Sequence, residues 1–163
     1  MQRKSEHRNQ KSLGRRRQSR ELALQLLYAL EITKFSVKET IKHYAQFGDM
    51  PNKIPMGDFT KTLLKEVKEH IQEVDAILRE VIANWRLERL SYIDRNILRL
   101  AACEIFYFDD IPPKVTINEY IEIAKDFGDD DSPSFINGIL DRIARESPKG
   151  KKEKETEDAG GGT

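Results

Sequence analysis

Four arginines lie within six residues near the start of the chain: Arg15, Arg16, Arg17 and Arg20. We call them the arginine cluster. A guanidinium group can bind phosphate through two hydrogen bonds and can also stack on a base. The cluster opens an apolar pattern typical of a helix, and a helix N-terminus adds free N–H groups and the positive end of a dipole. This combination favours a nucleic-acid backbone, and it does not distinguish RNA from DNA.

The net charge of zero conceals a segregation of charge along the chain. Residues 1–20 hold eight Lys or Arg against one acid, a net charge of +7, whereas residues 109–131 hold eight acids against two lysines, a net charge of −6. A basic N-terminal arm favours a polyanionic partner. The alternative is a solvated terminus that only keeps the protein in solution.

Three aromatic residues are candidates for stacking on unpaired bases, which is how single strands are often bound. They are Tyr28, Phe127 and Phe135. The alternative is burial in the core, and for Phe127 this alternative is favoured. Phe135 falls in the first turn of an expected helix, where an exposed ring is equally compatible with the pattern.

The residues offer little for catalysis. The sequence contains no G-x-x-x-x-G-K-[ST], G-x-G-x-x-G or H-E-x-x-H motif. His7, His43 and His70 have no partners at metal-ligand spacing, and Cys103 has no neighbour in sequence that would lower its pKa. We therefore expect a binding protein without enzymatic activity, metal or cofactor.

Length and composition set the class of protein. The length of 163 residues is sufficient for one domain with tails. Of these residues, 38% are hydrophobic and 34% are charged. The longest uncharged stretch, residues 22–30, is too short for a membrane span of about 20 residues. A single cysteine excludes an internal disulfide framework. These features predict a soluble cytoplasmic protein that contacts no membrane.

Apolar residues recur at helical spacing throughout residues 15–146, and no run alternates with period two. Helices are expected to begin near Arg16, at capping boxes opened by Ser36, Ser91 and Thr116, and at Ser132 with Pro133 in the first position. The pattern from Phe59 to Trp85 fits one bent helix or two. The prediction is an all-α fold of six or seven helices.

Both ends of the chain lack the apolar residues that a core needs. We expect a disordered basic extension over residues 1–14, a helical domain over 15–146 and a disordered charged tail over 147–163.

Three stretches resemble the NusB family of transcription antitermination factors. They are R-R-R-x-x-R-E-L-A-L-Q-L-L-Y at 15–28, W-R-L-E-R-L-S-Y-I-D-R-N-I-L-R-L at 85–100, and a block at 111–140 that contains I-N-E-Y-I-E-I-A-K and S-P-S-F-I-N-G. The resemblance covers about residues 15–145. It implies a fold of two small helical bundles, binding of single-stranded boxA-type RNA, and pairing with the ribosomal protein NusE. The complex would help RNA polymerase read through terminators, chiefly in ribosomal RNA operons.

The resemblance also implies roles for individual residues. Arg16, Arg17 and Arg20 match the family's RNA-binding start, where Gln18 replaces a frequent arginine. Asp131, Ser132 and Phe135 match a segment that touches RNA, although the preceding acids would repel phosphate and so favour contacts to base edges. The NusE-binding face is matched by Tyr28 and Asp94, and Asp94 also falls in the Ser91 capping box. The full set of expected RNA-binding residues is Arg15, Arg16, Arg17, Gln18, Arg20, Phe127, Asp131, Ser132 and Phe135.

Two alternatives remain open at this point. The chain could be a stand-alone RNA-binding module in rRNA processing or small-subunit assembly. It could also form a homodimer in which the arginine cluster is masked by a partner's aspartates.

Overall fold

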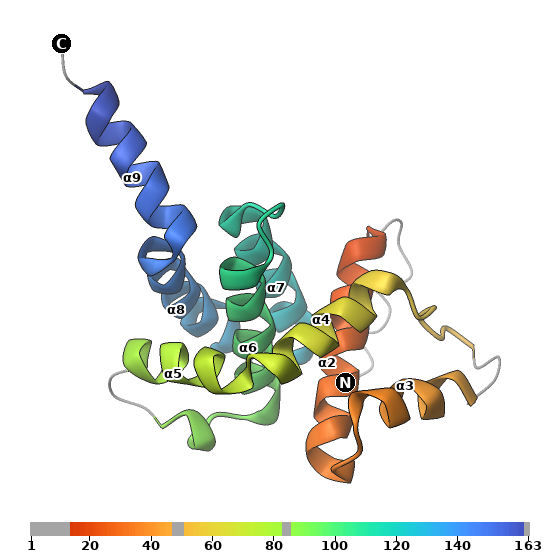
Figure 1. The fold of residues 1–163 in the computed structure, drawn as a ribbon. Coiled ribbons are helices and arrows are strands. Elements are labelled where there is room, and N and C mark those ends of the chain that lie inside the picture. The colour runs from red at the N-terminus through yellow and green to blue at the C-terminus, as the bar shows by residue number, and fades with distance from the viewer. Residues whose placement is uncertain (1–13, 47–50, 83–85, 162–163) are drawn as a thin grey trace. The chain divides into compact units, whose positions relative to one another are not determined.

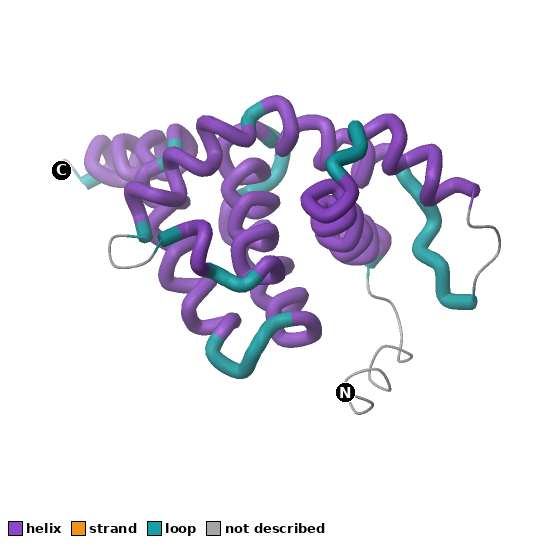
Figure 2. Tube along the Cα trace, turned by 90° about the horizontal axis from the view of Figure 1, so that it is seen from below, coloured by secondary structure: helices purple, strands orange, loops and turns teal. Residues whose placement is uncertain are grey.

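The computed structural model describes residues 14–46, 51–82 and 86–161, and throughout these ranges the regular structure is helical (Figures 1 and 2). The helices are α2 (Arg15–Thr33), α3 (Val37–Gln46), α4 (Asp58–Glu69), α5 (Ile71–Val81), the short 3-10 helix η2 (Leu87–Arg89), α6 (Tyr92–Tyr107), α7 (Pro113–Phe127), α8 (Ser132–Glu146) and α9 (Pro148–Gly160). The all-α prediction is confirmed. The predicted number of helices is wrong, since the described residues contain eight α-helices instead of six or seven.

The chain divides into two compact units, residues 1–65 and 66–163. In the first unit, α2 buries a stripe of leucines and alanine that includes Leu22, Ala23, Leu26, Leu27 and Leu30. This is the apolar face that the helical spacing predicted.

Helix α3 begins at the predicted capping box. The Ser36 hydroxyl accepts from the Glu39 amide at 3.1 Å, and the Glu39 carboxylate accepts from the Ser36 amide at 3.0 Å. Both bonds satisfy N–H groups that a helix start leaves unpaired. Gly48, a residue type that favours a helix end, follows this helix in the sequence and lies outside the described residues.

The long apolar pattern after Phe59 forms two helices, and the break falls at His70. The backbone of His70, with φ −105° and ψ 16°, leaves the helical region between α4 and α5. Its amide still donates to the Glu66 carbonyl at 3.0 Å, so the chain bends without losing this hydrogen bond. Trp85, the last residue of the predicted pattern, lies outside the described residues.

Helix α6 is the centre of the second unit. It packs against α5, α7 and α8, and its residues from Asn96 to Leu98 and from Leu100 to Ile105 are all buried. The predicted start is confirmed, because the Ser91 hydroxyl accepts from the Asp94 amide at 3.1 Å. Between α5 and α6, Arg99 makes two bonds to the Asp75 carboxylate, at 2.8 and 3.0 Å.

The capping box predicted at Thr116 is wrong. Helix α7 begins one turn earlier, at Pro113, and Thr116 is a fully buried residue inside it. Proline fits the first helical position because its φ is already helical and it has no N–H to satisfy. Two successive prolines therefore determined the start more strongly than the Thr-x-x-Glu pattern did.

The turn between α7 and α8 depends on a close approach at Gly128. A Cβ atom there would lie 2.6 Å from the Ser132 Cβ and 2.9 Å from the Ala124 carbonyl oxygen. Gly128 is the residue that ends α7. The N-cap of α8 is Asp131, however, one residue before the predicted Ser132. The Ser132 hydroxyl instead accepts from the Asp129 amide at 3.0 Å, closing the turn.

The C-terminal segment differs from the expected disordered tail, because Pro148–Gly160 form α9. In Figure 1 this helix leaves the end of α8 and extends beyond the other helices of its unit. The Ser147 hydroxyl accepts from the Gly150 amide at 3.2 Å, and Lys149 donates to the carbonyls of Phe108 and Ile111. The segment lacks apolar residues that could be buried, and polar contacts of its first turn anchor the helix instead.

Within the described ranges, no helix combines the length and the apolar composition that crossing a membrane requires.

Candidate nucleic-acid interface

The arginine cluster occupies the first two turns of α2. Arg15 and Arg16 are exposed, and Arg17 and Gln18 are half-buried. The N-cap residue Gly14 provides no side-chain cap, and the first turn contains no acid. The positive end of the helix dipole is therefore reinforced by cations instead of being neutralised.

The structure separates Arg20 from the rest of the cluster. Arg20 is only 2% exposed, with its guanidinium 5.2 Å from the centre of the Phe59 ring. Arg16 lies over the same ring at 4.3 Å but remains exposed. Nearby, the Thr60 hydroxyl donates to the Ser19 carbonyl at 3.0 Å and fastens the start of α4 to α2. The buried Arg20 thus contributes to the packing of α2 against the start of α4. Arg15 and Arg16 are exposed and accessible to a ligand.

In the second unit, four of the expected site residues line one pocket of about 280 Å³. Its lining residues are Leu90, Asp94, Asp129, Asp131, Ser132 and Phe135. We call this the acidic pocket. The structure thus brings together Asp131, Ser132 and Phe135, expected to touch RNA, with Asp94, expected to touch a protein partner.

Asp94 gives this pocket an unusual feature. Its Oδ1 atom is buried and accepts no hydrogen bond from the described residues. A buried acceptor without a donor costs free energy. The carboxylates of Asp94, Asp129 and Asp131 together make the pocket suited to N–H donors and unsuited to phosphate.

The two phenylalanines differ in position. Phe135 is half-buried and lines the acidic pocket at the start of α8. Phe127 is half-buried in the last turn of α7 and is not among the lining residues. Only Phe135 therefore presents its ring where the carboxylates of this pocket could bind the same base.

Tyr28 lies on α2 and is 43% exposed. Ile32, one turn further along α2, is 57% exposed, and Phe35, beyond the end of the helix, is 42% exposed. Neither was singled out in the sequence, although the spacing of four residues between Tyr28 and Ile32 was a usable signal. Tyr28 and Ile32, one turn apart on α2, are exposed apolar side chains that could contact a protein partner, whereas Phe35 stacks on the His43 ring with 5.0 Å between centroids.

Cys103 is fully buried in α6. Burial raises the pKa of its thiol, and the nearby carboxylates of Glu66 and Glu104 raise it further. The neutral thiol is not a nucleophile.

Fold and surfaces together define an all-helical protein of two compact units, with a cationic helix N-terminus in one and an acidic, phenylalanine-lined pocket in the other.

Comparison with known proteins identifies the family. The model of the NusB family matches residues 17–145. The transcription antitermination protein NusB of Trichlorobacter lovleyi is 40% identical over 145 residues, covering 89% of this chain and 100% of the relative. Among solved structures, T. maritima NusB is 34% identical with a TM-score of 0.71, covering 88% of this chain and 99% of the other. A chain in the crystal structure of antitermination factors NusB and NusE in complex with dsRNA is 25% identical with a TM-score of 0.68, covering 82% and 98%.

The chain therefore belongs to the NusB family, as the resemblance of its three sequence blocks indicated.

Proposed function

We propose that this protein is a transcription antitermination factor that binds boxA-type RNA together with NusE and promotes read-through in ribosomal RNA operons. The observation that carries the proposal is the similarity, over 82% of this chain, to a chain solved with NusE and RNA. The NusB relatives are named as transcription antitermination proteins. The proposed setting is the cytoplasm, in an assembly with RNA polymerase, and the proposed role is binding without catalysis.

The geometry supports a proposal of two kinds of RNA contact. The exposed cations Arg15 and Arg16, with the half-buried Arg17 and Gln18, would bind phosphates at the start of α2. In the acidic pocket, a base would stack on Phe135, and its exocyclic amine would donate a hydrogen bond to a carboxylate such as that of Asp131. This division removes the conflict between a run of aspartates and an anionic ligand.

The protein partner would use different residues. Tyr28, with the exposed Ile32 one turn further along α2, would contact NusE on the first unit. Asp94, which lines the acidic pocket, would contact NusE on the second unit. An interface commonly combines apolar anchors with a few paired polar groups in this way.

The test is fluorescence anisotropy with three labelled RNAs: a boxA-like single strand, a scrambled single strand and a boxA duplex. Each is titrated with and without NusE at two salt concentrations. The proposal requires tighter binding to the boxA single strand, strengthened by NusE. Equal binding to all three RNAs under every condition would contradict it, because a basic arm alone binds without sequence preference.

Light scattering on the same samples separates the homodimer alternative. A monomer that gains mass only with RNA and NusE agrees with the proposal. A dimer that must dissociate before RNA binds would indicate that self-association masks the arginine cluster.

A further inference from the structure

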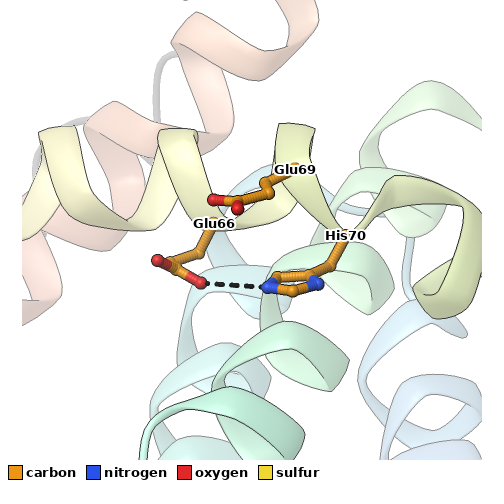
Figure 3. Close-up of side chains that lie close together, drawn as sticks. All are labelled: Glu66, Glu69 and His70. Carbon is orange, nitrogen blue, oxygen red and sulfur yellow. Dashed lines mark ion pairs between the residues drawn. The ribbon is translucent and has the colours of Figure 1, made fainter.

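A group of potential metal ligands lies at the bend between α4 and α5, and its members are not among the residues expected to bind RNA or a protein partner. Glu66 and Glu69 occupy the last turn of α4, and His70 follows at the bend (Figure 3). One atom of each side chain can be chosen so that the three lie within 4.8 Å of one another. The spacing of His and Cys residues alone does not reveal this group, because it contains one histidine beside two glutamates.

The spacing of the closest pair fits shared coordination. The Oε2 atom of Glu66 lies 3.3 Å from the Nε2 atom of His70. Two ligands of a tetrahedral Zn²⁺, each bound at about 2.0–2.2 Å, are separated by roughly 3.3–3.5 Å. A zinc ion could therefore enter between these two atoms with only small side-chain movements.

The histidine ring is held in place before any ion binds. Its imidazole stacks on the Tyr107 ring of α6, with 3.9 Å between centroids and 10° between planes. Side chains at metal sites bind more tightly when packing fixes their orientation. The preformed ring reduces the ordering that binding would require.

The surroundings favour a cation. Two of the three side chains are carboxylates, whose negative charges attract a cation. Glu66 and His70 are half-buried and Glu69 is exposed, so an ion could reach the site from solvent and keep water as a remaining ligand. One imidazole with two carboxylates is a donor set that zinc accepts.

We propose that Glu66, Glu69 and His70 form a zinc-binding site that links the last turn of α4 to the bend before α5.

The proposal goes beyond the antitermination function and does not depend on it. Isothermal titration with Zn²⁺, using the full chain without a histidine tag, is expected to show one ion bound per chain. Co²⁺ is expected to give visible absorption bands of a site with nitrogen and oxygen ligands. Zinc is also expected to raise the Tm of the wild-type protein.

Matched variants locate the site. His70→Gln and Glu66→Gln should each weaken zinc binding at least tenfold and remove the Tm shift, with unchanged circular dichroism. Glu80→Gln, which removes one exposed charge from α5, and His43→Ala, which removes another exposed imidazole, should leave binding intact. Absence of saturable binding in the wild type, equal affinity in His70→Gln, or loss of binding in His43→Ala would each overturn the proposal.

Discussion

At the scale of single residues, the arginine cluster shows what a sequence pattern could and could not predict. The concentration of charge at the start of α2 was evident from residue types alone. The difference between Arg16 and Arg20 was not, because it depends on Phe59, which is about forty residues away in the chain. In the same way, the meeting of Asp94 with Phe135 in one pocket depends on the packing of the second unit.

This difference leads to a paired prediction. Arg16→Ala should weaken RNA binding and reduce the slope of log affinity against log salt by about 0.7, the value for one phosphate contact in a single strand. Arg20→Ala should instead lower the free energy of unfolding by about 2 kcal/mol, because a desolvated cation–π contact is lost. Anisotropy titrations at several salt concentrations and urea denaturation measure the two effects, with Arg79→Ala as a control for loss of an exposed arginine. The assignment is wrong if the Arg20 variant changes the salt slope and the Arg16 variant does not.

The ring of Phe135 gives a second prediction. Phe135→Ala should cost about 1–3 kcal/mol of RNA-binding free energy if a base stacks on it. Phe135→Leu keeps apolar bulk in the half-buried site and should lose similar affinity while preserving the midpoint of urea unfolding. Normal affinity in the folded leucine variant would argue against stacking.

The buried thiol gives a third prediction. Since burial raises the pKa of Cys103, the folded protein should not react with a thiol reagent such as DTNB at pH 8, and should react once denatured. The stability that comes from burying the neutral thiol should be present below the unfolded pKa of about 8.5 and should fall as the pH rises above it. Rapid labelling of the native protein would show that α6 is less buried than described.

At the scale of elements, local signals predicted helix ends well where a single signal was present. The Ser36 and Ser91 caps formed as expected, and Gly128 ended α7. The prediction failed at Thr116, where a proline pair upstream competed with the capping pattern. It also failed at α9, whose anchoring depends on Lys149 reaching carbonyls near residue 110, which sequence periodicity cannot predict.

Two glycines in the second unit offer a matched test at this scale. Gly128→Ala should destabilise the protein by about 1–3 kcal/mol, because the new methyl group would overlap Ser132 and the Ala124 carbonyl. Gly138→Ala, inside α8 with open space around it, should stabilise by about 0.5–1 kcal/mol through its higher helix propensity. Urea denaturation measures both changes, and equal effects would contradict the steric argument.

At the scale of the whole molecule, the segregation of charge noted in the sequence is carried by different elements. The exposed cations of the arginine cluster open α2, and the carboxylates of the acidic pocket belong to α6 and the turn before α8. The distribution of charges along the sequence predicted this separation, and the spacing of apolar residues predicted the helical class. The division into two units was predicted only through the resemblance to a family, because periodicity indicates where helices lie and not which helices pack together.

The C-terminal helix gives the prediction at this scale. Removing residues 151–163, which are exposed throughout the part of α9 that the structure describes, should change the free energy of unfolding by no more than about 0.5 kcal/mol. Removing residues 148–163 also deletes Lys149 and its two bonds to the α6–α7 loop, and should cost more. Urea denaturation measures the free energy of unfolding of both shortened chains. A larger loss of stability in the chain that lacks only residues 151–163 would contradict the anchoring role of Lys149.

Helix α4 carries a consequence for any attempt to study the two units apart. The boundary between Lys65 and Glu66 falls inside this helix, and the fully buried residues Leu64 and Val67 lie on either side of it. A gene cut at that boundary would give each half a broken helix and an open patch of core. The halves are therefore expected to aggregate when expressed separately, and during translation the first unit cannot complete its packing until most of α4 has left the ribosome.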